Sequence, residues 1–483
     1  MSKMNRDGLI NSFLIAFLAG VSLGALLWKN NLLSCLGVGV VFLGLLYLRK
    51  RATVLMIVFL GCLLGLLRLG FDIESLREYR NYDGEVVAEL KSFPEIRSGQ
   101  QLAVLEIRSI GEKVFLGDFP KLMATFNFFD RIIPGQRFIL EGKLTALGLV
   151  NLRERDDWFR KKLNFQMEQP NFQIIYEDKF NLLGWLFIGR TFLLAKINQL
   201  FDQQTATMVA GVILGERGNI DKAILNDFKT TGLTHILAVS GFNITIIINF
   251  ILLGLIRFGK WWRLVLVIMV IVLFVILTGA SASVIRAGVM GVLALLIRTS
   301  ARSASILKVL LISGALIVFF DPTVLNFDLS FQLSFGATLS LVLFADWIDD
   351  FDFRAGWWKE LVMMVIWQTI AAQLIVLPII FVNFGQVSLI SPIANLLTAP
   401  LIPVLMFLGI LTILIGQVWL FLGQIVGVSA QLLVIILLKV TNLLAKIPLA
   451  SWTIGEGQYW LAIVYWYILF KLFRKRKLGP SFG

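Results

Sequence analysis

The sequence contains very few of the residues that build metal centres and disulfide frameworks. Among 483 residues there are one histidine and two cysteines. A single histidine cannot form a dinuclear zinc site that needs several histidines. Cys35 and Cys62 both lie inside apolar runs, where a cysteine is more often a small core residue than a reactive or bridging one. The composition therefore indicates neither a disulfide framework nor a metal site.

Signatures of catalysis are also scarce. The phosphate-binding pattern Gly-x-x-x-x-Gly-Lys-Ser/Thr does not occur in the sequence, so the chain cannot use ATP in that manner. Ser240 lies five residues after His235, and on a helix this spacing separates two side chains by about 140°, too far for a shared hydrogen bond. Close helix packing explains Ser240 and Gly241 better. We expect neither enzymatic activity nor a cofactor.

Charge is the third scarce property, and its scarcity excludes an ordinary soluble protein. Only 16% of the residues are charged, whereas 58% are hydrophobic. A membrane-spanning helix needs about 20 mostly apolar residues. Suitable runs cover residues 9–28, 32–48, 53–69, 233–256, 264–279, 282–298, 305–320, 327–346, 361–381, 388–415, 418–446 and 459–473. The first run follows Lys3 and Arg6, but two more runs follow at once, so we interpret it as a span rather than a cleaved signal peptide.

One of these apolar stretches, residues 388–415, is interrupted by prolines at positions 392, 400 and 403. Non-helical backbone at membrane depth persists only where protein buries it or water lines it. The stretch is therefore either a broken or re-entrant helix beside a cavity or a helix with an ordinary proline kink. The sequence favours neither alternative.

The positive net charge of +13 belongs to the apolar part of the chain. Residues 82–180 contain 14 Lys/Arg and 15 Asp/Glu, out of 44 and 31 in the whole sequence, so the remainder has a surplus of 14 positive charges. Short cytoplasmic loops concentrate Lys and Arg, and the strongest clusters are at 49–51 and 471–477. They predict that both termini are cytoplasmic and that residues 72–230 are outside. The later loops agree, since 257–263 and 298–302 fall inside, whereas 321–322, 383–386 and 451–458 fall outside.

The region 72–180 differs from its surroundings, because short runs rich in Val, Ile, Leu and Phe alternate with turn signals such as Pro134-Gly135. The runs cover residues 85–90, 101–107, 122–128, 137–144 and 172–176. About five strands in this length suit a small barrel such as the OB fold, which often binds single strands through stacked aromatic rings and a basic groove. The residues able to supply both are Phe126, Phe128, Lys121, Arg131 and Arg137. The near-neutral charge argues for a structural or partner-docking role instead, and both alternatives stay open.

The predicted fold class is an α-helical polytopic membrane protein with an inserted small β-barrel. From residue 180 to 199 apolar faces alternate with Arg190 and Lys196, which is typical of a helix at the membrane surface. We expect four parts: N-terminal transmembrane helices at 1–71, an extracytoplasmic OB-like domain at 72–180, interfacial amphipathic helices at 181–231, and a transmembrane channel domain at 232–477.

Several separated segments between residues 210 and 400 resemble one known family. They are AGVILGERG at 210–218, FKTTGLTHILAVSGFN at 228–243, TGASASVIRA at 278–287, FQLSF at 331–335, Pro378, and PIANL at 392–396 with Pro400. In this order they resemble the ComEC-type DNA-internalisation competence proteins. Several motifs in one order are far more specific than any one of them, and the resemblance spans most of the chain.

The resemblance implies an inner-membrane conduit through which one strand of captured DNA enters the cytoplasm during natural transformation. It also implies an extracytoplasmic OB-like domain, which agrees with the strand pattern, and partners: single-stranded DNA, a cytoplasmic helicase-like motor, and an extracytoplasmic DNA receptor. Longer members of the family carry a metallo-β-lactamase-like nuclease domain, which the single histidine cannot supply here. We therefore expect a short form, served by a separate nuclease or adapted to a related transport task.

Arg286 is the strongest candidate for the conduit. It lies a turn inside an apolar run, with Ser283 one turn before it. A buried arginine costs roughly 2.5–3.5 kcal/mol on insertion scales, so its presence is a functional-site hypothesis by default. The alternative is that Arg286 extends to the nearby outer interface.

Other polar residues in apolar runs extend this argument. If a helix runs unbroken from Leu233, a polar stripe of Thr234, His235, Asn243, Thr245 and Asn249 covers about half of its circumference. Such a stripe either faces a water-filled interior or forms hydrogen bonds between helices. The full set of conduit candidates is His235, Ser240, Asn243, Asn249, Ser283, Arg286, Gln332, Ser334 and Asn395.

Two functions therefore compete. The first is a single-stranded DNA channel in the cell inner membrane. The second is a polytopic transporter or flippase for another anionic substrate, such as a lipid-linked sugar phosphate, with the soluble domain as a docking module. The ordered motifs favour the first.

Overall fold

A computed structural model describes residues 79, 82–97, 100–115, 119–127, 130, 132–146, 163–177, 181–216, 218, 220–237, 239, 241–254, 257, 259–280, 282–299, 306–320, 324, 328–344, 357–453 and 465. The predicted spans at 9–28, 32–48 and 53–69, and all but Tyr465 of the span at 459–473, lie outside these residues. The chain divides into two compact units, Met1–Lys196 with Gly241–Phe331 and Ile197–Ser240 with Gln332–Gly483.

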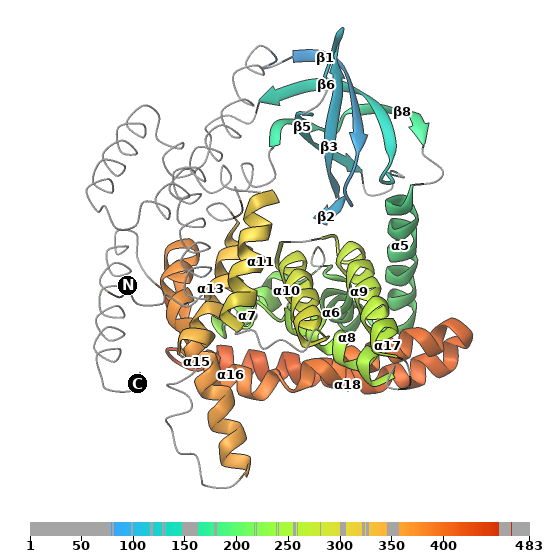
Figure 1. The fold of residues 1–483 in the computed structure, drawn as a ribbon. Coiled ribbons are helices and arrows are strands. Elements are labelled where there is room, and N and C mark those ends of the chain that lie inside the picture. Colours follow the sequence, from blue (N-terminus) through green and yellow to red (C-terminus); the bar gives the residue numbers. More distant parts are fainter. Residues whose placement is uncertain are drawn as a thin grey trace, which may run out of the picture. The chain divides into compact units, whose positions relative to one another are not determined.

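The first unit contains a β-barrel (Figure 1). Its strands are β1 (Tyr82–Leu90), β2 (Glu95–Arg97), β3 (Gln100–Ile110), β4 (Lys113–Val114), β5 (Lys121–Asn127), β6 (Gln136–Ala146), β7 (Leu163–Glu168) and β8 (Asn171–Glu177). The order β1-β3-β5-β7-β6 closes through pairing of β1 with β6, so five strands form a ring. β5 and β7 are parallel, and the other neighbours in the ring are antiparallel. The predicted OB-like barrel is confirmed.

Alternating burial explains why these segments form a closed barrel. Along β3, Gln101, Ala103, Leu105 and Ile107 are buried while their neighbours are partly exposed, which is the period of two expected for a strand with one face in a core. The barrel core is built from such inward residues of all five ring strands. Burying a Leu or Phe side chain contributes roughly 1.5–3 kcal/mol, so this core stabilises the barrel.

Four predicted strands match ring strands, and the fifth prediction matches β8. β8 pairs with β6 beside the ring, whereas the remaining ring strand, β7, was not predicted. β7 closes the barrel through only two residue pairs with β6, at Thr145 and Ala146.

The helices of the first unit are α8 (Gly241–Gly254), α9 (Lys260–Leu277), α10 (Ala282–Thr299) and α11 (Ile306–Phe320), and α10 packs on the other three. A methyl group on Gly288 would lie 3.1 Å from the Val275 side chain of α9. One on Gly291 would lie 3.0 Å from Ile248 of α8. Small residues on α10 thus allow close helix packing. α5 (Leu182–Leu200) begins in the first unit and ends in the second, and α13 (Leu329–Leu343) does the same.

The second unit contains α6 (Gln203–Leu214), α7 (Lys222–Thr230), α15 (Trp357–Phe384), α16 (Ser391–Thr398), α17 (Leu401–Val418) and α18 (Leu420–Ala445), with the short strands β9 (Gln386–Ser388) and β10 (Ser451–Thr453). α17 and α18 form the most extensive helix pair (Figure 1). α6 packs against both, and nine of its twelve residues are buried. α6 is thus a core helix of its unit, whereas Phe228 is the one buried residue of α7. The interfacial position of residues 181–231 stays a prediction.

Among the described residues, three segments are long and apolar enough to cross a membrane: Val362–Phe381, Ser391–Val418 and Leu420–Ala445. Shorter apolar helices cover Gly241–Leu252, Trp261–Leu277, Val284–Leu296, Ile306–Phe320 and Leu329–Leu343. Many large apolar side chains on these helices are exposed, Val418 by 91%. Exposed apolar surface of this extent fits a bilayer as the solvent. The predicted fold class, a helical membrane protein with an inserted barrel, is confirmed.

The proline-rich stretch is divided between α16 and α17. Backbone angles stay helical at Ala399 (φ −58°, ψ −38°) and Pro400 (φ −65°, ψ −23°), so the chain continues in nearly the same helical path. This geometry favours a helix with a proline kink over a broken or re-entrant helix.

Candidate functional site

Two of the motif segments form the same helix ending. At the end of α7, Gly232 has a φ of +73°, and the Leu233 N–H donates to Phe228 O at 2.8 Å. At the end of α9, Gly279 has a φ of +80°, and the Ala280 N–H donates to Val275 O at 2.9 Å. In both, a glycine adopts the left-handed conformation without a Cβ penalty, and at the end of α9 Ala280 also has a positive φ, of 51°. The Thr-Gly pairs of the motifs therefore terminate helices.

Gly232 also lets its loop approach α16 closely. A methyl group at Gly232 would lie 2.8 Å from Ser391 Cβ and 3.0 Å from Ser388 Cβ. Ser391 is fully buried and its hydroxyl is hydrogen-bonded to the Gln373 amide of α15. The Ser388 hydroxyl is buried without a hydrogen-bond partner in the described part of the chain. Parts of three motif regions, around Gly232, Pro378 and Pro392, thus meet in one polar cluster of the second unit.

Inside α15, Pro378 interrupts the helical hydrogen bonds. Proline has no N–H to donate to the carbonyl four residues earlier, at Leu374. The Tyr465 hydroxyl donates to Leu374 O instead, at 3.0 Å. One turn earlier, the buried Ser340 hydroxyl of α13 donates to Ala371 O and accepts from the Ile375 N–H at 3.3 Å. Hydroxyl groups from other segments therefore form hydrogen bonds with the backbone groups of this opened turn. α15 contains a membrane-span candidate, and backbone groups in apolar surroundings need such partners.

The first unit holds a buried charge in an apolar helix. Arg286 on α10 is 3% exposed, and its Nε and Nη1 atoms have no hydrogen-bond partner among the described residues. The carboxylate of Asp328, also 3% exposed, is its electrostatic partner. Asp328 Oδ1 in addition accepts from the Phe331 N–H at 3.1 Å, at the start of α13. The buried arginine thus has unused donor atoms among the described residues, and guanidinium donors suit an anionic ligand.

The structure separates the polar stripe predicted for one helix. α8 begins at Gly241 rather than near Leu233, because the Gly232 ending and the following turns intervene, so the expectation of an unbroken helix was wrong. His235 is exposed, and its Nδ1 lies 3.2 Å from Gly232 O in the second unit. Asn243 is 2% exposed in the first unit, whereas Asn249 on the same helix is exposed. Ser240 lies outside the described residues.

The remaining conduit candidates divide between the units. Asn243 and Arg286 lie on packed helices, since a methyl group at Gly241 would be 3.4 Å from Ala287 Cβ. Ser283 lies in the first turn of α10. Gln332 and Ser334 are half-buried on α13, and Asn395 is half-buried on α16. Asp328 and Ser340 were not among the candidates, although both are buried polar residues at these sites.

The barrel places its predicted DNA contacts differently. Phe126 is 1% exposed and packs in the core against Phe138 and Phe172, with ring centroids 6.0 and 5.2 Å away, so its ring is closed to a base here. Lys121 at the start of β5 is half-buried. Arg137 is exposed and lies over the Tyr176 ring, 5.2 Å from its centroid. Phe128 and Arg131 lie outside the described residues.

Arg137 belongs to an ion-pair cluster around Glu89. The Glu89 carboxylate is nearly buried and pairs with Lys91, with Arg108 at 2.8 Å and with Arg137 at 3.1 Å. Burial raises the pKa of Glu89, but hydrogen bonds and ion pairs with Lys91 and Arg108 outweigh it, so the pKa lies below its ordinary value. The negative charge of Glu89 thus neutralises part of the positive charge that Lys91, Arg108 and Arg137 would present to a nucleic acid.

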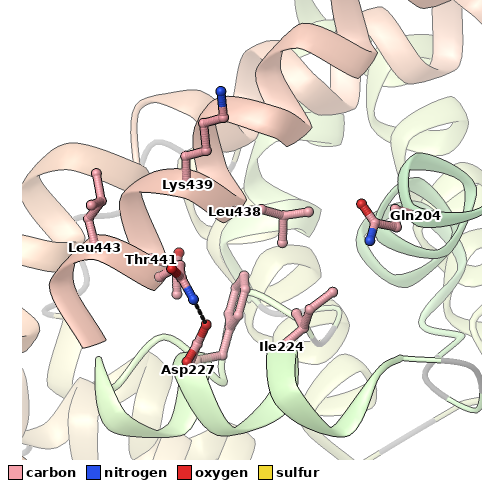
Figure 2. A pocket seen from close by; sticks show the side chains of 9 residues that line it. Gln204, Ile224, Asp227, Leu438, Lys439, Thr441 and Leu443 are labelled. Carbon is pink, nitrogen blue, oxygen red and sulfur yellow. Dashed lines mark hydrogen bonds between the residues drawn. The ribbon is translucent and has the colours of Figure 1, made fainter. Parts of the chain in front are cut away.

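A cavity of about 380 Å³ opens between α6, α7 and α18 (Figure 2). Its lining residues are Gln204, Ile224, Asp227, Phe228, Leu438, Lys439, Thr441, Asn442 and Leu443. The Asn442 amide donates to Asp227 Oδ2 at 2.7 Å, and Lys439 extends away from Asp227 (Figure 2). The bond fastens α7 to α18, and the lining includes none of the conduit candidates.

An OB-like barrel joined to apolar helices with buried polar groups defines the class as a helical membrane protein with an inserted soluble domain. The chain belongs to the competence protein family, whose model matches residues 212–478, more than half of the sequence. The match includes all of the motif segments between residues 210 and 400, except the first two residues of AGVILGERG. The resemblance seen in the sequence is thereby confirmed.

Two curated relatives support the assignment. ComE operon protein 3 of Bacillus subtilis (strain 168) is 25% identical over 384 residues, which cover 75% of this chain and 46% of that protein. Uncharacterized protein YcaI of Escherichia coli (strain K12) is 28% identical over 205 residues, which cover 40% of this chain and 27% of that protein. The chain thus spans less than half of the length of either relative. No solved structure matches it.

Proposed function

We propose that this chain forms the inner-membrane conduit through which single-stranded DNA enters the cytoplasm during natural transformation. Membership of the competence protein family supports DNA as the cargo. The observation that carries the proposal is Arg286, a buried cation in an apolar helix. Two of its nitrogen atoms have no hydrogen-bond partner in the part of the chain that the structure describes. A cation kept at this depth is costly unless an anion uses it.

The physical demand on such a conduit is to replace water around a polyanion. Each nucleotide carries one phosphate charge, and moving that charge through hydrocarbon unscreened is prohibitive. Arg286 supplies a positive charge, and half-buried polar side chains such as Gln332, Ser334 and Asn395 supply hydrogen bonds. In the proposed transport these residues neither form nor break covalent bonds, so none of them has a catalytic role.

The other parts of the system follow from the same role. The barrel stands outside the membrane, where it receives the strand or docks a receptor, with Lys121 and Arg137 as its described basic contacts. Both termini are cytoplasmic. Because the sequence has no phosphate-binding loop of the ATP-using type, a cytoplasmic helicase-like motor pulls the strand, and a separate nuclease prepares it.

Pairing of β9 with β10 supports the proposed topology. Residues 383–386 and 451–458 were both expected outside, and β9 and β10, which begin at Gln386 and Ser451, form one small sheet. Two loops on opposite sides of a membrane could not pair in this way. Single cysteines at positions 100 and 480 decide the absolute orientation. An impermeant thiol reagent should label position 100 in intact cells and spare position 480, and the reverse pattern would invert the topology.

The test of function is uptake of labelled DNA by cells that lack or carry this protein. DNA uptake should require the protein. Arg286→Gln should abolish most of the uptake. The variant should still insert into the membrane, because the substitution removes a charge that is costly to insert. Arg286→Lys should retain more, because the positive charge remains although the planar fork is lost. Arg263→Gln, at the first turn of α9, is the matched control and should import normally. Equal import by the three Arg286 forms would remove this residue from the conduit.

A further inference from the structure

One wall of the cavity between α6, α7 and α18 belongs to the membrane-span candidate Leu420–Ala445. Lys439 and Leu443 line this wall, and both side chains are exposed, Leu443 by 66%. Ile436, three positions before Lys439, is 46% exposed, and residues three or four positions apart share one face of a helix. The cavity therefore borders an apolar surface that a bilayer would cover.

Lys439 lies close to one end of this membrane-span candidate. Ala445, the last residue of the candidate, follows six positions later, which is about 9 Å along a helix. The flexible four-carbon stem of lysine bridges such a distance and places the ammonium group among lipid headgroups. Among the described residues, Lys439 has no ion-pair partner, and its side chain extends away from Asp227 (Figure 2). Its charge is thus available to an anion at the membrane surface.

The α7 wall of the same cavity carries the opposite charge. Asp227 is half-buried, and its Oδ2 accepts from the Asn442 amide at 2.7 Å. A carboxylate has about four acceptor positions, so this bond leaves room for a cationic donor. The volume of about 380 Å³ lies within the range of small-molecule sites, about 300–1,000 Å³. The cavity thus combines a cation, an anion and a lipid-facing rim.

We propose that this cavity binds the headgroup of phosphatidylethanolamine, a phospholipid that joins a phosphate to a primary ammonium group. Lys439 pairs with the phosphate, Asp227 accepts hydrogen bonds from the ammonium group, and the acyl chains lie along the exposed apolar face of α18. Phosphatidylglycerol has the phosphate but no ammonium group, and the trimethylammonium group of phosphatidylcholine has no N–H to donate. The site contains none of the conduit candidates, so it goes beyond the proposed transport of DNA.

The alternative is a lysine that only extends to the membrane surface. Such a lysine attracts anionic lipids in general, and Asp227 then has no part in lipid binding. The two explanations predict different lipid preferences. Asp227 favours phosphatidylethanolamine, whereas an isolated lysine favours phosphatidylglycerol.

The test compares the three lipids on the full chain. The chain is purified in detergent and mixed with micelles that contain equal amounts of phosphatidylethanolamine, phosphatidylcholine and phosphatidylglycerol with the same acyl chains. Native mass spectrometry then measures how much of each lipid is bound. Phosphatidylethanolamine should bind roughly tenfold more tightly than either competitor, because one hydrogen bond to a charged group is worth about a decade of affinity.

The variants separate the two charges. Asp227→Asn keeps an oxygen that can accept from Asn442 but removes the negative charge, so the preference for phosphatidylethanolamine should disappear while α7 stays attached to α18. Lys439→Met should weaken binding of all three lipids, and Lys439→Arg should retain it. The matched controls are Asp221→Asn on α7 and Lys446→Met after α18, which lie outside the lining and should leave the preference unchanged.

Equal binding of the three lipids by the wild-type chain overturns the proposal. So does a preference for phosphatidylglycerol, which is the result expected for a lysine acting alone. A preference for phosphatidylethanolamine that persists in Asp227→Asn also overturns it. No DNA is present in these measurements, so their result is independent of whether the chain imports DNA.

Discussion

Adding one methyl group at Gly423 should separate two membrane helices. Gly423 lies on α18 where it crosses α17, and a Cβ there would be 2.6 Å from the Cα atom of Gly416 and 2.8 Å from Leu200 Cδ2. A leucine side chain can rotate away, but a backbone atom cannot. The substitution Gly423→Ala therefore forces α17 and α18 apart along the most extensive helix pair of the second unit.

The magnitude follows from two opposing effects. Alanine in a helix interior gains up to about 1 kcal/mol over glycine. Overpacking a close contact costs about 1–3 kcal/mol, and a backbone contact takes the upper end. Gly423→Ala should thus lose roughly 2 kcal/mol. Gly427→Ala should lose less, because its nearest contacts are the Phe201 ring and the Thr412 methyl group, both at 3.2 Å.

The matched control is Gly189→Ala on α5, where no described atom lies within 4 Å of the added methyl group. It should be neutral or slightly stabilising. Thermal unfolding in detergent, followed by the loss of monodisperse protein, ranks the three variants. If Gly423→Ala is as stable as wild type, or if Gly189→Ala is the most destabilised, the close approach of α17 and α18 is not what limits packing here.

Three further perturbations test other parts of the fold. The pKa of Glu89 is lowered in the folded state, so its ion pairs stabilise the barrel above the unfolded pKa of about 4.3, and this stability is lost as pH falls through the folded pKa. Glu89→Gln should therefore weaken the dependence of barrel stability on pH in the acid range. An unchanged pH dependence contradicts the ion-pair account. Ser340→Ala should lower stability by about 1–3 kcal/mol, because backbone groups of the opened turn lose their hydrogen-bond partner. Adding Pro378→Ala should recover part of this stability, which thermal unfolding measures. No recovery would argue against Pro378 as the cause of the opened turn. Asp227→Ala should cost about 1 kcal/mol by removing the acceptor of Asn442 and should speed hydrogen exchange in α7, whereas unchanged exchange would mean that apolar contacts alone hold this helix.

The barrel was largely predictable because its signal is local. Alternation with a period of two marks β3 and β6 directly, and turn residues mark their ends. β7 escaped prediction because it follows the charged run at 153–162 and is only six residues long. Its parallel pairing with β5 depends on contacts about 40 residues apart, which no local pattern encodes.

The candidate site was predictable only in part, for a similar reason. Arg286 is conspicuous as a charge in an apolar run. Asp328 lies at the edge of such a run, where an aspartate before a helix reads as an ordinary cap. Its electrostatic effect on an arginine 42 positions earlier depends on the tertiary fold, which no local pattern encodes. Ser340 was hidden for the same reason, because its partner is the backbone of another helix.

The segment at 228–243 contains a break that the interpretation as one continuous helix did not include. Thr234, His235 and Asn243 fall on one face only if one helix carries them all, and Gly232 had already ended α7 in the left-handed conformation. The chain then passes from the second unit to the first between Ser240 and Gly241, so the motif contributes His235 to one unit and Asn243 to the other. The transition between Phe331 and Gln332 likewise falls inside a motif. The polar residues of a motif that connects two units must therefore be assigned to sites one by one rather than as a stripe.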